Sequence, residues 1–464
     1  MRTYDVVIVG GGVVGCAIAR RLSLTRATVA LLEAASDVGE GASKGNSGIA
    51  TCGAETTPGT LESELILASA HGWEALCAAL DTPFERIGTL SLALTADEEA
   101  RLPHMLAEAK ANGVAAEIVS GAEARRLEPL VTPDVRAALH VPGDGIIDPI
   151  RLTVGYAELA ARNGADIRRS TRVTGAQRDG DRVTVLDTTA GPVGARFVVN
   201  AAGVEADTVA ALAGGAELSS WPRHGQAWLL DRELGRHFAK SVGGIPDEVT
   251  RGVYVTPTTN RSVLVGPTAR NHDDRDDRRT DAETLDAIME RGRRLVPSIA
   301  PERAIKVFAA NRPAGDPVYR VERDATIANL VHAAAIRSTG VSSSPAVAEL
   351  VRALLEEAGA PVGEDRPDAT LALLPLPRLL GHPHPEALVA VDPRYGQVIC
   401  ACEQVTAAEI AAAFAMRVPP RTLDAVRKRT RATGGRCQGA FCQAGVSFLC
   451  SAYGGIRPEE VWPA

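Results

Sequence analysis

The stretch Tyr4-Asp5-Val6-Val7-Ile8-Val9-Gly10-Gly11-Gly12-Val13-Val14-Gly15 opens the chain and decides its fold. Its first half is a mostly apolar run, which is typical of a parallel strand buried on both faces. An apolar helical stretch follows from Cys16 to Leu24, and a second buried run, Ala27 to Leu32, ends on Glu33. The order of strand, glycine turn, helix, strand and acid predicts an α/β fold of the Rossmann type.

Each glycine of this turn has a physical task. Gly10 permits the tight turn, Gly12 lets the backbone approach a pyrophosphate, and Gly15 lets the helix pack closely on the strand. The helix N-terminus offers amide donors and a partial positive charge to the phosphates. Glu33 is placed to accept hydrogen bonds from a ribose diol and would repel a ribose phosphate, which disfavours NADP. The motif predicts a dinucleotide site and leaves FAD and NAD both open.

The composition sets outer limits on the protein class. The 464 residues are 45% hydrophobic and 23% charged, which predicts two or three folded domains and excludes disordered, collagenous and disulfide-rich chains. We expect no transmembrane segment, because no uncharged apolar run approaches the roughly 18–20 residues that a span needs. A net charge of −7 argues against nucleic-acid binding. The early strand leaves no room for a signal peptide, so we expect a cytoplasmic protein. The alternative is a peripheral position at the inner face of the membrane, where a partner holds the protein.

Cysteines gather near the C-terminus. Five of the eight lie in the last part of the chain, at Cys400, Cys402, Cys437, Cys442 and Cys450. In a reducing compartment such a cluster is more often metal-binding than disulfide-bonded. The first four form two pairs and suit tetrahedral zinc or an iron–sulfur cluster, and the one-residue gap in the first pair favours [2Fe–2S]. The fifth is expected in a small core.

Two further patterns accompany these cysteines. From Cys402 to the end there are eight basic and five acidic residues, so this part is positive although the whole chain is negative. A positive field stabilises the negative charge of a four-thiolate cluster. The Pro- and Leu-rich stretch before the cysteines, 360–385, predicts a linker at a boundary that few contacts cross.

Taken together, these pieces resemble a known arrangement. Residues 1 to about 360 resemble the D-amino-acid-oxidase-like superfamily of FAD-dependent oxidoreductases, in particular its glycerol-3-phosphate dehydrogenase and L-2-hydroxyglutarate oxidase branch. Residues from about Gln397 to Gly445 are similar to the bacterioferritin-associated-ferredoxin-like (BFD-like) [2Fe–2S] domain. The stretches that carry the first resemblance are Gly10 to Gly15 with Glu33, Gly41 to Gly48, Pro58 to Leu61, Gly88 to Leu90, Asp148-Pro149, Asn200 to Gly203, and Ile336 to Pro345.

The resemblance implies a fold and a division of the chain. It implies a Rossmann-like FAD-binding domain with an inserted mixed-sheet substrate domain, followed by a small C-terminal helical iron–sulfur domain. The expected FAD-binding parts are about 1–85, 145–215 and 325–360, the substrate parts about 86–144 and 216–324, the linker 361–390, and the BFD-like domain 391–464.

The resemblance also implies which residues bind FAD beyond the glycine turn. The segment after the ribose acid wraps the flavin, a strand start presents its backbone to the adenine, a small turn lies beside the cofactor, and a helix N-terminus faces the flavin pyrimidine oxygen. In that order the residues are Ser43, Lys44, Asn46, Ser47 and Gly48, then Val173, then Ala202 and Gly203, then Gly340, Val341 and Ser342.

For the substrate, the resemblance points to anion-binding side chains. Arg312 would grip a carboxylate or phosphate, and Tyr254 and Arg337 are further contacts to the same group. The branch carries a histidine where this chain has Thr51, and threonine cannot act as a general base near neutral pH. Either His224 takes the proton, or the substrate is an amine that loses its own proton.

The expected function is therefore an FAD-dependent dehydrogenase acting on a small anionic hydroxy substrate, of the glycerol-3-phosphate or 2-hydroxy-acid type. Hydride would pass to FAD, and the electrons would leave through the [2Fe–2S] cluster to a carrier protein, a partner subunit or a quinone-linked chain. One alternative is a component of an amino-acid, opine or hydroxyproline dehydrogenase complex. Another, of a different class, is an iron–sulfur redox-sensing or assembly protein with an inert flavin fold.

Overall fold

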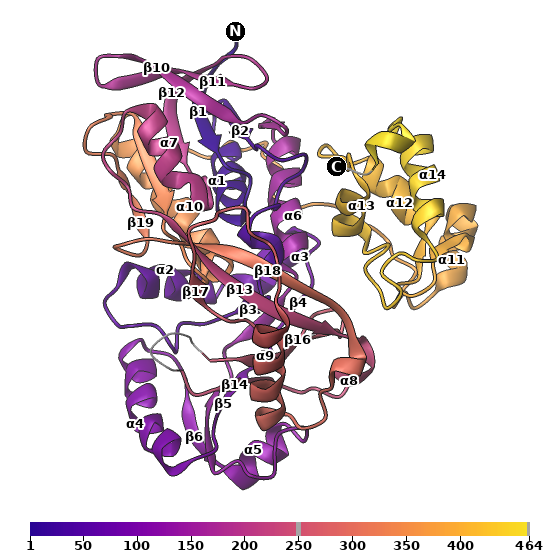
Figure 1. Cartoon of the computed structure of the whole chain (residues 1–464). Coiled ribbons are helices and arrows are strands. Elements are labelled where there is room, and N and C mark those ends of the chain that lie inside the picture. The colour runs from indigo at the N-terminus through magenta and orange to yellow at the C-terminus, as the bar shows by residue number, and fades with distance from the viewer. Residues whose placement is uncertain (247–251, 462–464) are drawn as a thin grey trace.

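The computed structural model describes residues 1–246 and 252–461. Figure 1 shows one sheet with its helices in the upper part of the view, a second sheet below it, and a small helical domain set to one side at the C-terminal end. This is the α/β architecture with a second sheet and a C-terminal helical domain that the sequence predicts.

The first sheet is built around the glycine-turn strand. Strand β1 lies parallel between β2 and β12, β20 continues the sheet beyond β12, and β9 beyond β2, so the buried centre is parallel throughout. The antiparallel strands β10, β11 and β19 complete its edges. The strands are β1 (Thr3–Val9), β2 (Val29–Leu32), β9 (Asp166–Arg168), β10 (Val173–Asp179), β11 (Arg182–Thr188), β12 (Val193–Asn200), β19 (Arg320–Arg323) and β20 (Leu330–Ala334).

Helices cover this sheet on both faces. One face packs against α1, α6 and α10 in the largest apolar core of the described residues, and α7 packs on the other face. Helix α6 begins with Asp148 as N-cap, whose carboxylate accepts the N–H groups of Ile150 and Arg151. The helices are α1 (Val13–Ser23), α6 (Pro149–Arg162), α7 (Ala206–Ala213) and α10 (Gly340–Glu357).

The second sheet is mixed, as predicted. Its order is β17-β13-β16-β15-β14-β5-β7-β6 with β18 beside β13, and only β14 and β5 pair in parallel. The strands are β5 (Thr89–Ala93), β6 (Glu117–Ser120), β7 (Ala137–Val141), β13 (Trp221–Leu230), β14 (Ser241–Gly244), β15 (Tyr254–Pro257), β16 (Val263–Gly266), β17 (Arg270–Asn271) and β18 (Ala304–Ala314). The neighbouring helices are α4 (Ala96–Ala111), α5 (Gly121–Leu127), α8 (Arg232–Gly235) and α9 (Ala282–Leu295).

A short sheet and two helices connect these parts. Strand β8 pairs with β3 and with β4, both antiparallel. The elements are β3 (Ile49–Ala50), β4 (Phe84–Glu85), β8 (Gly145–Ile147), α2 (Leu61–Ala70) and α3 (Trp73–Ala79).

The C-terminal domain is mainly helical and has its own core. Cys450 is fully buried there among Ile410, Val426 and Val446, as the sequence predicts for the fifth cysteine. Its elements are α11 (Pro385–Val391), β21 (Val398–Cys400), β22 (Val405–Thr406), α12 (Ala407–Phe414), α13 (Leu423–Thr430) and α14 (Gln443–Gly454). Across the two described ranges, every helix is too short or too polar to span a bilayer.

The expectation that few contacts cross to this domain is wrong. Arg429 of α13 forms two ion-pair hydrogen bonds with Asp37, at 2.7 and 3.0 Å, and the Asp37 side chain is 0% exposed. Arg169 and Lys428 reach the same carboxylate. Val418 packs into the core that holds α1 and α6, and its N–H donates to Glu158 at 2.9 Å. The C-terminal domain is therefore docked on the first sheet's helices by buried charge and by apolar packing.

The stretch between α10 and α11 also packs against the part of the chain that carries the first sheet. Arg366 donates to the carbonyls of Ser23 and Asn163, and Arg378 pairs with Asp81 at 2.9 Å. The stretch between α10 and α11 has little regular structure, but these contacts hold it against the first domain.

Candidate functional site

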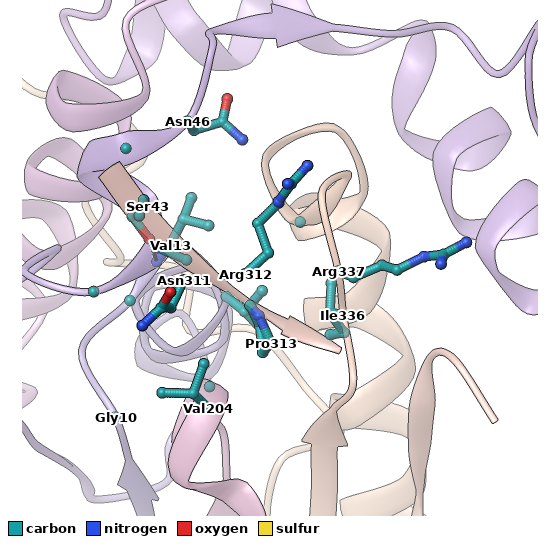
Figure 2. A pocket seen from close by; sticks show the side chains of 18 of the residues that line it. Gly10, Val13, Ser43, Asn46, Val204, Asn311, Arg312, Pro313, Ile336 and Arg337 are labelled. Atoms are coloured by element: carbon teal, nitrogen blue, oxygen red, sulfur yellow. Dashed lines mark hydrogen bonds between the residues drawn. The ribbon is translucent and has the colours of Figure 1, made fainter. Parts of the chain in front are cut away.

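A cavity of about 820 Å³ runs along the carboxyl ends of β1, β2, β12 and β20 and continues to the second sheet. The carboxyl edge of a parallel sheet is where α/β folds bind ligands. Figure 2 shows the cavity from close by, with Gly10 and Ser43 on the side of the first sheet and Arg312 reaching in from β18.

The glycine turn forms one wall. Gly10 has φ +109°, and a Cβ atom there would lie 2.3 Å from the Ala201 carbonyl oxygen, so no other residue fits. A Cβ at Gly12 would meet only the Ser43 hydroxyl, at 3.5 Å, which leaves its backbone approachable from the cavity. Gly15 does not line the cavity; a Cβ there would lie 2.0 Å from the Gly10 carbonyl oxygen, so this glycine serves the close packing of α1 on β1.

Glu33 stands at the end of β2 and lines the cavity. Its carboxylate accepts the N–H groups of Gly11 and Ala35, both at 2.7 Å, which fixes it beside the turn. Burial raises its pKa, and these amide bonds act in the opposite direction. Val173 lines the same end of the cavity at the start of β10.

Some residues of the loop after Glu33 line the cavity and others do not. Ser43, Asn46 and Ser47 line the cavity, and the Ser43 hydroxyl accepts the Val13 N–H at 2.9 Å. Lys44 does not: it pairs with Glu40 and lies 3.7 Å from Asp424 of the C-terminal domain.

Gly48 also lies behind the cavity wall. Its carbonyl accepts the Ile147 N–H at 2.8 Å, and its φ is +75°. The structure thus turns Lys44 and Gly48 away from the cavity, although sequence position suggested both as flavin contacts.

The remaining predicted cofactor residues meet at the cavity. Ala202 and Gly203 line it from the turn after β12, and Gly340, Val341 and Ser342 line it from the N-terminal end of α10. The Ser342 hydroxyl accepts the Thr51 N–H at 3.1 Å, which joins the α10 N-terminus to the segment after β3.

Three arginines line the other end of the cavity. Arg312 on β18 and Arg223 on β13 are register partners, and Arg337 follows β20. The Arg312 guanidinium donates to the Thr268 carbonyl and to the Arg223 carbonyl at 3.3 Å, which fixes its plane. Burial and then the charge of Arg337 lower the pKa of Arg223, so two cations stand close together here. Such a grouping suits a ligand with more than one negative charge.

Tyr254 and an acid that the sequence did not point to, Glu55, also line the cavity. The Tyr254 hydroxyl donates to Glu55 Oε2 at 2.8 Å, and the Ser91 hydroxyl donates to Glu55 Oε1 at 3.0 Å. Tyr254, Glu55 and Thr51 line the cavity.

His224, the candidate proton acceptor, does not line the cavity. Its Nδ1 lies 2.9 Å from Asn311 Oδ1, and its ring lies 5.7 Å from that of His272. His224 follows Arg223 on β13, and because side chains alternate along a strand, it points away from the arginine face.

The four predicted metal ligands come together in the C-terminal domain as two thiol pairs. Cys402 and Cys437 lie within hydrogen-bonding reach of each other, and so do Cys400 and Cys442. N–H groups of 439–441, that of Phe441 first, lower the pKa of Cys437, whereas burial and Cys400 raise the pKa of Cys442 to about 11. No three His, Cys, Asp or Glu side chains of the described ranges are grouped to hold a single metal ion.

Comparison with known proteins identifies both parts. Residues 5–354 match the family described as FAD dependent oxidoreductase. The chain belongs to this family. Residues 398–448 of this FAD dependent oxidoreductase match the BFD-like [2Fe-2S] binding domain. The chain is thus a flavoprotein oxidoreductase with an iron–sulfur domain, and the alternative of a protein outside the enzyme class is set aside.

Relatives of this FAD dependent oxidoreductase span its whole length. It is 33% identical to the glycerol 3-phosphate dehydrogenase of Caloramator mitchellensis, over 99% of this chain and 96% of the relative. It is 28% identical to one subunit of the anaerobic glycerol-3-phosphate dehydrogenase of Escherichia coli (strain K12), over 97% and 89%. The dithionite-reduced L-alpha-glycerophosphate oxidase of Mycoplasma pneumoniae with FAD bound matches with a TM-score of 0.76 and 27% identity, covering 81% of this chain and 100% of that one.

The residues of this oxidoreductase fit the two cofactors. A turn without Cβ atoms at the α1 N-terminus, a carboxylate at the end of β2 and small residues at the α10 N-terminus suit FAD. Two thiol pairs suit a cluster in which each iron takes two thiolates.

Sequence reasoning missed Glu55 and Arg223 in this site. Neither belongs to a motif. Glu55 lies in a turn after β3 and meets Tyr254 and Ser91, and Arg223 reaches the cavity from β13 of the second sheet. The register of Arg223 opposite Arg312 is the signal that could have found it, had the pairing of β13 with β18 been predicted.

Proposed function

We propose that this enzyme oxidises the hydroxyl-bearing carbon of a small, doubly charged substrate, glycerol 3-phosphate in the first place. The observation that carries the proposal is the grouping of Arg223, Arg312 and Arg337 at the end of the cavity opposite Glu33. A phosphate carries the charge that two close guanidinium groups need, and it accepts several hydrogen bonds at once. The full-length relatives named glycerol-3-phosphate dehydrogenase support this substrate.

In this proposal, each wall of the cavity has its own task. The FAD that the chain binds supplies hydride acceptance. Gly10, Gly12 and Glu33 hold its dinucleotide part, with Val173 at the adenine, while Ser43, Asn46 and Ser47 wrap the ring. Ala202 and Gly203 lie beside it, and the α10 N-terminus (Gly340, Val341 and Ser342) favours negative charge on the ring.

The substrate wall binds and orients. Arg312, held by backbone carbonyls, and Arg337 bind the phosphate, and Tyr254 contributes a hydroxyl at the same end. Thr51 fixes the loop through its N–H bond to Ser342 and does not exchange protons.

We propose further that electrons leave through a [2Fe–2S] cluster held by Cys400, Cys402, Cys437 and Cys442. The acceptor is a carrier protein, a partner subunit or a quinone-linked chain, in line with the Escherichia coli relative, which is named as one component of a larger dehydrogenase. The oxidoreductase part is residues 1–360, the connecting stretch 361–390 and the cluster part 391–464. A cytoplasmic enzyme held at the inner face of the membrane by its partner fits this electron path.

A second candidate is an amino-acid, opine or hydroxyproline dehydrogenase. The observation that favours it is Thr51, which cannot take a proton, together with the placement of His224 outside the cavity. An amine that loses its own proton needs no such group.

The test is an anaerobic screen for loss of the oxidised flavin absorbance. We expect bleaching by glycerol 3-phosphate, and slower or no bleaching by 2-hydroxyglutarate, proline or an opine. Bleaching by an amine alone would replace the first candidate with the second.

A further inference from the structure

A run of charged residues forms part of the cavity wall and has no task in the proposed reaction. After β17 the chain reads His272-Asp273-Asp274-Arg275-Asp276-Asp277-Arg278-Arg279 and then enters α9. A run of mixed charges is usually a solvated surface loop. Here, however, three of its side chains, those of Arg275, Asp276 and Arg278, line the cavity. We refer to residues 272–279 as the charged loop.

The charged loop is anchored to the second sheet through Asn311. This residue lies on β18 at the cavity and is only 2% exposed (Figure 2). Its Nδ2 donates to the loop carbonyls of Asp274 at 3.4 Å, Arg275 at 3.0 Å and Asp277 at 3.1 Å. Its Oδ1 lies 2.9 Å from His224 Nδ1, and this contact fixes the orientation of the amide. His224 therefore supports the backbone of the charged loop from outside the cavity.

Arg275 joins the same loop to the side of the cavity that the first sheet forms. Its two Nη atoms donate to the two carboxylate oxygens of Asp207, at 2.7 and 2.6 Å, which is a two-pronged contact. Its Nη1 also lies 3.1 Å from Glu205 Oε2 and 3.0 Å from the Thr208 hydroxyl. The Arg275 and Asp207 side chains are 26% and 25% exposed, so water screens this pair less than an ordinary surface pair.

The charged loop thus bridges the two sheets along one wall of the cavity. Arg275 lines the cavity together with Glu205 and Thr208, whereas Asp207 holds Arg275 from outside it. FAD is the largest molecule that this cavity takes, and Gly203, next to this wall, is one of the residues that we place beside it. Because the wall is contributed by two sheets, the ion pair between them decides whether it stays closed.

We propose that Arg275 and Asp207 form a clasp that closes the charged loop beside bound FAD and slows the release of the cofactor. Arg275 is a positioning residue, because it acts by holding the loop that carries Asp276 and Arg278. The clasp opens when the two-pronged ion pair separates, and no covalent bond changes. The proposal needs bound FAD, which this oxidoreductase family uses, and goes beyond the proposed function because it does not depend on the substrate.

The test measures how fast FAD leaves the holoprotein after dilution, from the rise in fluorescence as flavin becomes free. We expect the release rate to rise by about tenfold in Arg275→Gln and in Asp207→Asn, because each removes the two-pronged contact. Arg275→Lys should have a smaller effect, since lysine keeps the charge. Arg86→Gln is the matched control: Arg86 makes a two-pronged contact with Glu74, at 2.7 and 3.0 Å, outside the cavity.

Three further measurements separate a clasp from a general loss of structure. Added sodium chloride should speed FAD release in the parent protein more than in Arg275→Gln, because salt screens the ion pair. The double variant Arg275→Asp with Asp207→Arg, which exchanges the two charges, should restore slow release in part. With excess FAD present, the melting temperature of Arg275→Gln should match that of Arg86→Gln.

Release at the parent rate in both Arg275→Gln and Asp207→Asn would overturn the proposal. Faster release in Arg86→Gln as well, or a lower melting temperature of Arg275→Gln in excess FAD, would also overturn it, because general destabilisation would then explain the result. A higher KM for glycerol 3-phosphate with unchanged FAD release would make the loop a substrate wall instead. The proposed function fails separately: if glycerol 3-phosphate does not bleach the flavin, the release rates still test the clasp.

Discussion

The flavin cavity and the cysteine centre are built in opposite ways. The cavity draws its walls from segments spread between Gly10 and Ser342, and much of what it offers is backbone, glycine and carbonyl groups. The cysteine centre uses four side chains from two short segments of one small domain. A site made of distributed backbone tolerates the loss of many single side chains, whereas a site made of four sulfurs depends on each of them.

The two regions meet at one buried carboxylate. In sequence, Asp37 lies between the cavity residues Glu33 and Ser43, and its carboxylate is surrounded by Arg169, Lys428 and Arg429. The loop that shapes the flavin site is thus also the loop that holds the cluster domain. A mutation of Asp37 itself should therefore affect both regions, whereas a mutation confined to one region should leave the other intact.

The largest expected effect is at a single sulfur. Replacement of any one of Cys400, Cys402, Cys437 and Cys442 by serine should remove the iron while the flavin stays bound, because the thiols lie in another domain. Cys450→Ser should keep the cluster at the cost of some packing. Iron and zinc content with the visible spectrum of anaerobically purified protein decides this; one zinc and no iron would contradict a cluster.

Asp37→Asn tests whether the two regions are joined. Removing the carboxylate takes away the charged partner of the buried Arg169 and Arg429, while Lys428 keeps Glu40, and this should cost about 3–5 kcal/mol of stability. We expect a lower melting temperature, faster proteolysis between 361 and 390, and weaker FAD retention. The control is Glu349→Gln, an exposed partner of Arg21 that should change stability by about 0–1 kcal/mol. Normal FAD content with a released cluster domain would show that the two regions are separate.

Arg312→Lys acts on the cavity alone. Lysine keeps the charge but cannot bond the Arg223 and Thr268 carbonyls and the substrate together. The expected loss is about 1.5–3 kcal/mol, seen as a higher KM with unchanged flavin and iron content. An unchanged KM would move the anchoring role to Arg337.

The smallest effect concerns pH. Burial alone would raise the pKa of Asp37, but Arg429, Lys428 and Arg169 outweigh it and hold the value at about 2, below the ordinary 3.8. Its contribution to docking is therefore complete above about pH 4 and is lost as pH falls from about 4 toward 2. Pepsin cleavage between 361 and 390 should rise in that window, and Asp37→Asn should remove the rise.

Local sequence order predicted the fold better than it predicted the substrate site. The glycine turn and Glu33 form a short-range pattern whose geometry follows from chain connectivity. The thiol pairs Cys402–Cys437 and Cys400–Cys442 instead join two segments that are distant in sequence. His224 lies outside the cavity because its neighbour Arg223 takes the cavity face of β13. Lys44 also lies outside the cavity, because it pairs with Glu40 and Asp424 at an interface that no local pattern reveals. The Glu55 carboxylate is held where β15 and β5 bring Tyr254 and Ser91 together, which no local pattern shows.

The packing of Val418 into the first core has a consequence for the kinetics of electron passage. A cluster domain on a flexible linker would reach the flavin by diffusion. The rate of that encounter would fall as the linker becomes longer or the solvent more viscous. Here the C-terminal domain is docked in one position, so the distance between flavin and cluster stays constant. The rate of electron transfer from flavin to cluster should therefore not depend on solvent viscosity. It should also not change when glycine and serine residues are inserted near Leu374, which is 79% exposed.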